Sequence, residues 1–174
     1  MAETMSNYPA ASEYAPYYGR YVSLVPEGDI VETLTRQMES TLALLGGIDE
    51  EKAGWRYAEG KWSIKEVLGH IIDGERIFAY RALRFARNDR TELPGFEQDG
   101  YVQYGGFDAR SLGDLAQEFE SVRRANLLMF GGLDDDAWQR RGVASNAEVS
   151  VRALAFIIAG HELHHTGILR TRYL

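Results

Sequence analysis

The 174-residue chain contains no cysteine, which excludes disulfide bonds and thiolate ligands supplied by the protein. A bound metal ion would therefore need nitrogen or oxygen ligands. No apolar run approaches the roughly 20 residues that a membrane-spanning helix requires. The N-terminus also lacks the basic segment and apolar segment that together form a signal peptide. These absences predict a cytoplasmic protein.

Positive charge is scarce as well. The chain has 19 Lys and Arg residues against 26 Asp and Glu, for a net charge of -7. Nucleic acids and acidic membrane surfaces attract proteins with an excess of positive charge, so the composition argues against both as partners. Five arginines, Arg76, Arg81, Arg84, Arg87 and Arg90, are interleaved with acidic residues and are expected on a solvated, salt-bridged surface.

Four segments have the hydrophobic periodicity of amphipathic helices. They run from about Asp29 to Leu45, Ser63 to Arg87, Ser111 to Phe130 and Ser150 to Tyr173. Asp29 and Ser63 are predicted N-caps, and Glu66 completes a capping box with Ser63. The pattern predicts an all-α fold, an up-and-down four-helix bundle over residues 28–174. Residues 1–27 hold three of the four prolines and are expected to form an extended arm, either loosely ordered or laid on the bundle.

Two connections in the predicted bundle are long. Residues 88–110, between the second and third helices, lack helical periodicity and are rich in glycine, tyrosine and acid. A loop of this length is usually functional or mobile. It could cap a pocket with the side chains of Glu97, Asp99, Tyr101 and Tyr104, or it could be a solvated surface loop. Residues 134–149 read as a polar link, and no β pattern of useful length is apparent.

All four histidines fall in two of the predicted helices. His70 lies on the inward side of the second helix, and His161, His164 and His165 lie together in the fourth. On a helical wheel, His161 and His165 share the middle of an apolar stripe, because residues four apart are neighbours on one face. His164 lies at the edge of that stripe and is expected to be a bystander.

Imidazoles on an apolar face need a partner. A single buried histidine is usually a hydrogen-bonded core residue, which is the simpler interpretation of His70 taken alone. The pair at i and i+4 favours a metal site instead. The run from His161 to His165 also matches the HExxH motif of metalloproteases, but only nine residues follow it and none is His, Asp or Glu. A third ligand must therefore come from upstream, and His70 is the best candidate.

Two carboxylates near the histidines could orient a ligand or a bound water. Asp73 follows His70 by almost one turn, and it could equally be a solvated residue. Glu162 is rotated about 100° from His161, so it is expected to face a neighbouring helix or solvent rather than to act as a base.

Two segments of the sequence resemble characteristic motifs of the DinB-like superfamily. The segment from Tyr57 to Arg76, YAEGKWSIKEVLGHIIDGER, is similar to the second-helix signature of this family, and AGHELHH, ending at His165, is similar to its fourth-helix motif. The resemblance covers roughly residues 30–174. It implies a four-helix bundle with one divalent metal ion, commonly nickel or zinc, held by residues that correspond here to His70, His161 and His165.

The resemblance implies an activity only in outline. Members of the family include S-transferases that use low-molecular-weight thiols, a maleylpyruvate isomerase, and proteins described as metal-dependent hydrolases. The leading expectation is an enzyme that transfers such a thiol to a small electrophilic substrate. Hydrolysis by a metal-bound water and a bundle whose metal is not catalytic are the alternatives. The family also implies a possible homodimer.

Overall fold

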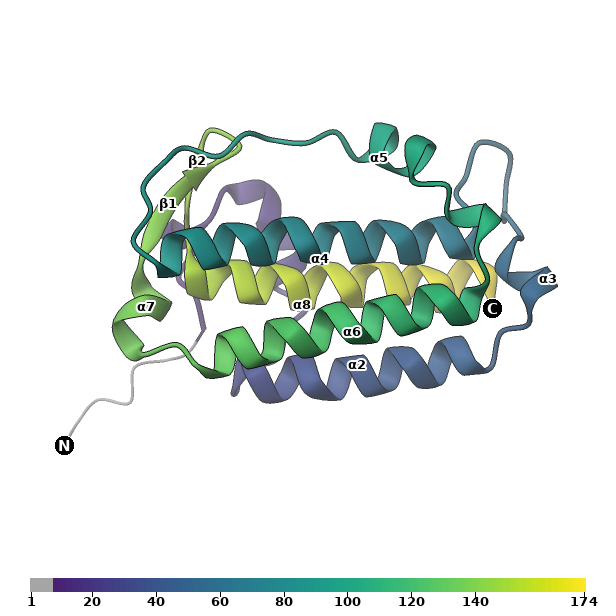
Figure 1. The fold of residues 1–174 in the computed structure, drawn as a ribbon, viewed down its shortest axis with the longest axis horizontal. Helices are drawn as coiled ribbons and strands as arrows, with labels where there is room; N and C mark the ends of the chain where they lie inside the picture. Colours follow the sequence, from purple (N-terminus) through teal and green to yellow (C-terminus); the bar gives the residue numbers. More distant parts are fainter. Residues whose placement is uncertain (1–7) are drawn as a thin grey trace.

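The computed structural model describes residues 8–174 and contains a bundle of four long helices (Figure 1). These are α2 (Ile30–Gly46), α4 (Ile64–Ala86), α6 (Leu112–Gly131) and α8 (Val151–Ile168). Helix α4 packs against α6 and α8, and α2 completes the square against the same two helices. The predicted all-α four-helix bundle, with its long loop between the second and third helices, is confirmed.

The long loop changes the direction in which the chain enters the third helix. It returns along the length of the bundle, so α4 and α6 run in the same direction and the up-and-down alternation is interrupted once (Figure 1). Helices α2 and α8 run the opposite way. As a result α4 and α8, which carry the histidines, are antiparallel neighbours.

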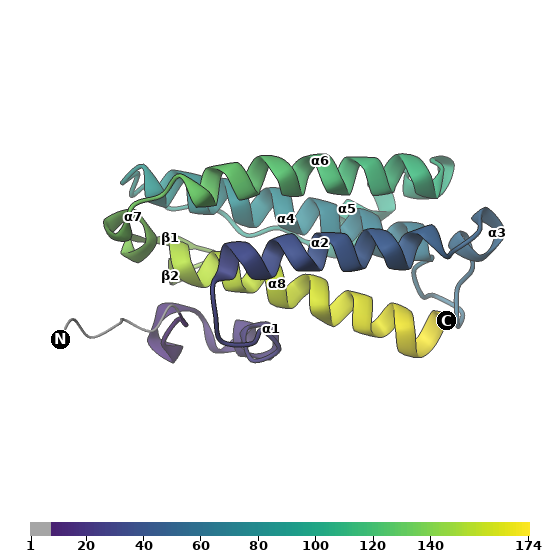
Figure 2. The same cartoon turned by 90° about the horizontal axis from the view of Figure 1, so that it is seen from below.

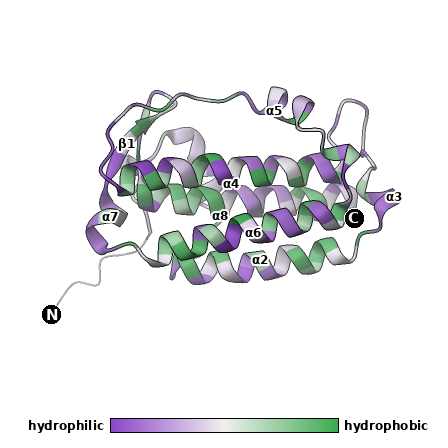
Figure 3. Ribbon diagram, viewed as in Figure 1, coloured by the Kyte–Doolittle hydropathy of each residue, from purple (hydrophilic) through white to green (hydrophobic). Residues whose placement is uncertain are grey.

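Each long helix begins at the type of residue that the sequence predicts. Asp29, Ser63, Ser111 and Ser150 each accept a hydrogen bond from a backbone N–H in the first turn of their helix, and Ser63 with Glu66 forms the predicted capping box. These bonds satisfy backbone donors that a helix leaves unpaired at its N-terminus. Helix α8 is buried on all sides from Ala153 to Glu162, and its N-terminal half is almost continuously apolar (Figure 3).

The connections between the long helices contain short helices of their own. Two short helices, α3 (Glu50–Ala53) and α7 (Asp135–Gln139), follow α2 and α6, and the loop after α4 contains α5 (Gln98–Gly105). Helix α5 has glycines at positions 100 and 105, which weaken a helical pattern.

The expectation that the chain has no useful β structure is wrong. Strands β1 (Arg141–Ala144) and β2 (Ala147–Ser150) form an antiparallel hairpin in which Arg141 pairs with Ser150 and Ala144 with Ala147. Strands of four residues are too short to show an alternating pattern, and the two-residue turn between them lacks the glycine that usually marks a hairpin.

The described part of the arm is folded onto the bundle. Residues 8–27 form two 3₁₀ turns and the short helix α1 (Gly19–Val22), which packs against α8 (Figure 2). The buried Glu13 carboxylate accepts hydrogen bonds from the Ser150 hydroxyl and the Arg152 guanidinium at the start of α8. Residues 1–7 of the predicted arm lie outside the described residues. No helix within residues 8–174 combines the length and apolar character needed to cross a lipid bilayer.

The last turn of the chain departs from a regular α-helix. The fourth helix was predicted to continue to Tyr173, but its α-helical part ends at Ile168 and Leu169–Tyr173 form a π-helix. The Tyr173 hydroxyl donates a hydrogen bond to the backbone carbonyl of Trp62, just before α4. This bond holds the end of the chain against the start of the helix that carries His70.

A buried ion network joins all four long helices. Arg123 of α6 is fully buried and donates hydrogen bonds to both carboxylate oxygens of Glu75 on α4, at 2.6 and 2.8 Å. The same guanidinium bonds Glu162 of α8 at 2.7 Å and the Leu34 carbonyl of α2 at 2.9 Å. Glu162 in turn accepts a bond from Thr41 of α2 at 2.6 Å. Burial raises the pKa of Glu162, and the neighbouring Arg123 opposes that shift.

We expect Arg123→Met to unfold far more easily than the wild type. The substitution would leave two buried carboxylates without a cation, and breaking a buried pair in this way costs about 3–5 kcal/mol. Urea unfolding at pH 7 measures the loss. Arg124→Met is the matched control, because Arg124 is exposed and its ion pair with Glu120 lies on the surface. Equal stability of the two variants would contradict a structural role for the network.

Gly160 allows α1 to approach α8, and we expect Gly160→Ala to be destabilising. A Cβ atom at this position would lie 2.1 Å from the backbone oxygen of Tyr21, so the arm would have to move. Overpacking of this kind costs about 1–3 kcal/mol. Gly167→Ala is the control, because a Cβ there meets nothing within 4 Å and alanine favours a helix. Urea unfolding in the presence of a chelator should show opposite signs for the two variants, and a loss of similar size in both would contradict the packing argument.

Candidate metal centre

His70 lies in α4 and its ring faces the histidines of α8. The side-chain Nε2 atoms of His70 and His161 are 2.9 Å apart, and the ring of His165 lies 4.7 Å from that of His70 and 4.5 Å from that of His161, centroid to centroid. The possible ligand atoms of all three histidines lie within 4.8 Å of one another. The structure therefore brings together the three residues that the sequence nominates as ligands.

Gly74 leaves the space that the His161 ring occupies. A Cβ atom on Gly74, one turn after His70, would come within 2.9 Å of the His161 ring. A larger residue at this position in α4 would require the His161 ring to shift. The Trp62 ring also packs against His70, at 5.0 Å between centroids.

The three imidazoles are held in their neutral form. Burial, with a smaller contribution from His164, lowers the pKa of His70 to about 4. Burial and then the charge of His70 lower the pKa of His165 to about 3, and the pKa of the deeply buried His161 lies well below its usual value for the same reasons. All three rings therefore offer a lone pair at neutral pH, which is the form that binds a metal ion. A nitrogen donor set of this kind fits nickel or zinc.

His164 is placed apart from this group. It is half-buried, and its ring contacts those of Tyr21 and His165 edge to face, at 5.4 and 4.9 Å. It is not among the three residues whose ligand atoms converge.

Asp73 and Glu162, the two carboxylates predicted to lie near the site, are in different surroundings. Glu162 points into the buried ion network with Arg123, so it faces a neighbouring helix as expected. Asp73 is half-buried, and its pKa is raised by burial against an opposing effect of Arg76. Within residues 8–174, no hydrogen bond links either carboxylate to a histidine ring.

A cavity of about 290 Å³ opens beside the histidines, and we call it the vestibule. Its walls are largely aromatic and come from the arm, from α4 and from the connections. They consist of Tyr17, Tyr18, Tyr21, His70, Phe78, Phe96, Glu97, Gln98, Ser145 and His161. Of the four loop residues predicted to cap a pocket, only Glu97 lines the vestibule. Tyr101 packs on Phe96 instead, and Tyr104 is 86% exposed.

Sequence reasoning missed most of these walls. The arm tyrosines and Ser145 lie far from the histidine motifs along the chain, and no local pattern connects them. The assignment of Arg81 to a solvated surface is also wrong. Arg81 is 3% exposed, and its Nη2 donates hydrogen bonds to the Pro94 carbonyl and the Ser145 hydroxyl.

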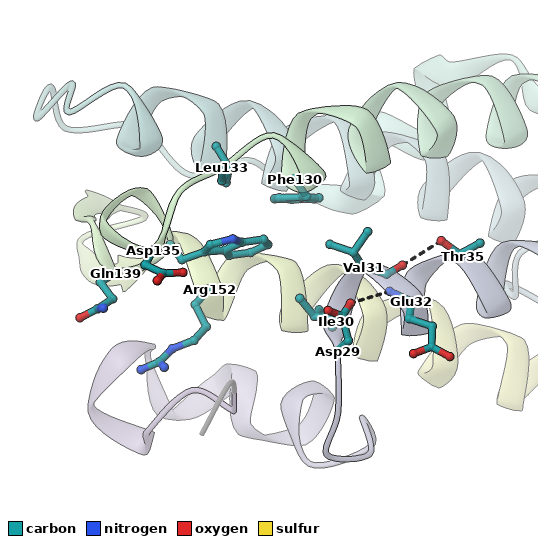
Figure 4. A pocket seen from close by; sticks show the side chains of 12 residues that line it. Asp29, Ile30, Val31, Glu32, Thr35, Phe130, Leu133, Asp135, Gln139 and Arg152 are labelled. Carbon is teal, nitrogen blue, oxygen red and sulfur yellow. Dashed lines mark hydrogen bonds between the residues drawn. The ribbon is translucent and has the colours of Figure 1, made fainter. Parts of the chain in front are cut away.

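A larger cavity of about 980 Å³ lies near the start of α2 and the end of α6 (Figure 4). It is lined by Phe130 and Trp138, whose rings stack at 5.5 Å, and by acidic side chains that include Asp29 and Asp135. Asp29 is engaged in capping α2. This cavity contains no histidine, so its size does not make it the candidate site.

Comparisons with known proteins agree with this geometry. A protein of Oceanobacillus iheyensis named "Putative metal-dependent hydrolase" is 23% identical over 137 residues, which cover 78% of this chain and 76% of that protein. The fold resembles YfiT from Bacillus subtilis, described as a probable metal-dependent hydrolase with an unusual four-helix bundle topology. The TM-score is 0.66 at 12% identity, over 93% of this chain and 91% of YfiT.

A second solved structure with a similar fold is a mycothiol-dependent maleylpyruvate isomerase. The TM-score is 0.67 at 12% identity, and the match covers 83% of this chain but only 61% of the isomerase. The family model described as the DinB superfamily matches residues 33–169. Because this match spans well over half of the chain, the protein belongs to the DinB superfamily.

Proposed function

We propose that this protein is a metal-dependent enzyme that transfers a low-molecular-weight thiol to a small electrophilic substrate. His70, His161 and His165 would hold one divalent ion, nickel or zinc. The observation that carries the proposal is the convergence of three neutral imidazoles beside a cavity of small-molecule size. The enzyme would act in the cytoplasm, as a homodimer, with residues 28–174 as its metal-binding domain and residues 1–27 as its arm.

The metal and the protein would have separate roles. A divalent ion held by three neutral ligands is a Lewis acid that lowers the pKa of a thiol or water reaching it. The protein keeps the imidazoles unprotonated by burying them, and the vestibule beside them offers largely aromatic walls to a small molecule. Glu162 would act only through the backbone of α8, by fixing the helix that carries His161 and His165. Asp73 would orient a ligand or a water near His70.

Thiol transfer and hydrolysis need the same three ligands and differ in the nucleophile. The likeness to a mycothiol-dependent isomerase supports a thiol, whereas the names of the other two relatives support water. A purely structural metal site would be closed by a fourth protein ligand. Within residues 8–174, the converging group consists of three histidines, which supports a site with a position left open.

Metal content should depend on His70 and not on His164. We expect elemental analysis after dialysis to find one ion per chain in the wild type and in His164→Ala, and none in His70→Ala. Adding the ion should raise the melting temperature of the first two proteins but not of the third, because only a bound ion stabilises the fold. Equal retention of metal in both variants would contradict the assignment of His70 as a ligand.

The nucleophile can be identified by supplying or omitting a thiol. We expect the metal-loaded protein to consume a small electrophile such as 1-chloro-2,4-dinitrobenzene only when a low-molecular-weight thiol is present. His70→Ala, treated in the same way, should show only the uncatalysed rate. Turnover that is independent of thiol would reject transfer in favour of hydrolysis. Absence of turnover in both conditions, with metal bound, would favour the non-catalytic alternative.

A further inference from the structure

Ser145 has an unusual backbone conformation for a serine. It occupies the first position of the two-residue turn between β1 and β2, with φ of 54°, and Asn146 follows with φ of 61°. Left-handed conformations at both positions suit the twist of a hairpin, but glycine and asparagine adopt them most readily. A serine here carries a cost in strain, and such strain tends to be retained where a side chain has a function.

Two hydrogen bonds hold Ser145 at the wall of the vestibule. Its backbone N–H donates to the Leu93 carbonyl at 3.1 Å, and its Oγ accepts a hydrogen bond from Arg81 Nη2 at 3.0 Å. Because Arg81 already donates to the oxygen, the hydroxyl hydrogen is available to an acceptor inside the vestibule.

Arg81 is a buried cation without an anionic partner in the described part of the chain. Its guanidinium lies 5.8 and 5.9 Å from the ring centroids of Phe78 and Phe96, which both line the vestibule. No carboxylate of residues 8–174 lies within 4.0 Å of it, whereas the equally buried Arg123 has two. A buried charge is costly unless it is compensated, so the Arg81 charge favours an anion nearby.

The acid in the vestibule does not neutralise this charge. The Glu97 carboxylate is turned toward its own helix, where it caps α5 by accepting hydrogen bonds from the backbone N–H groups of Asp99 and Gly100, at 3.3 and 2.9 Å. Glu97 is also exposed to solvent, which screens its charge. The wall formed by Ser145 with Arg81 behind it therefore remains electropositive.

We propose that Ser145 is a binding residue for the carboxylate of a small molecule, with Arg81 as the positioning residue that polarises its hydroxyl. This inference rests on the proposed function, because it takes the vestibule to be the substrate site. It goes further by naming the chemical class of the ligand, a carboxylate. The ligand would carry one carboxylate at Ser145 and a flat, apolar body between the aromatic walls. That carboxylate could belong to the electrophile or to the thiol.

The test measures binding to metal-free protein, so that neither a metal–carboxylate contact nor turnover contributes. Benzoate and its neutral isostere benzamide are titrated at pH 7 in the presence of a chelator, and NMR amide shifts around residues 95–98 and 144–147 report the Kd. We expect benzoate to bind about tenfold tighter than benzamide, as a charge-assisted hydrogen bond implies. Mercaptoacetate and 2-mercaptoethanol are compared in the same way.

Three variants separate recognition from folding. Ser145→Gly removes the hydroxyl but relieves the left-handed strain, so its melting temperature should not fall while its preference for benzoate disappears. Arg81→Gln should lose the same preference, and Arg81→Lys, which keeps the charge, should retain part of it. Arg84→Gln, three residues along the same helix and bonded to Asp89 at the surface, should bind both probes as the wild type does.

The outcomes decide the proposal independently of the metal experiments. A preference for benzoate alone assigns the subsite to the electrophile, a preference for mercaptoacetate alone assigns it to the thiol, and both together show that either reactant fits. The absence of any preference for the charged probes would overturn the proposal, as would an unchanged preference in Ser145→Gly. Such a failure would leave metal binding and thiol-dependent turnover untouched.

Discussion

The antiparallel packing of α4 against α8 brings together the three histidines of the candidate metal centre. Three imidazoles lie between these antiparallel helices. The Nε2 atoms of His70 and His161 are 2.9 Å apart, and a Cβ atom on Gly74 would crowd the His161 ring at 2.9 Å. Burial keeps the rings neutral, which costs stability unless a partner uses their lone pairs. The three neutral imidazoles at this interface are the group that we propose holds one divalent ion.

Adjacent residues of helix α8 belong to two different polar clusters, the histidine group and the buried ion network. His161 faces the vestibule, and the next residue, Glu162, turns to Arg123 in the interior. The ion network ties α2, α4 and α6 to the same turn of α8, so the position of the histidines is set by the whole bundle. Tyr21 of the arm and Ser145 of the β1–β2 hairpin line the vestibule together with His70 and His161, although these segments are far apart along the chain.

The bundle and its histidines could be predicted because both depend on local periodicity. The spacing of His161 and His165 places them on one face of a helix whatever the surroundings. The remainder depends on contacts that sequence position does not encode. Arg81 and Arg123 look like surface residues among neighbouring charges, yet the folded chain buries both. The hairpin and α5 are too short to produce a pattern, and the arm tyrosines reach the site only because Gly160 lets α1 approach α8.

We propose that three histidines from two helices bind one ion and leave a position open to an incoming reactant. X-ray absorption spectroscopy of the zinc-loaded protein, before and after addition of a low-molecular-weight thiol, counts the ligands of that ion. We expect three imidazole ligands in both spectra and a sulfur ligand that appears only with the thiol. A shell of four protein ligands that the thiol leaves unchanged, or fewer than three imidazoles, would contradict this proposal.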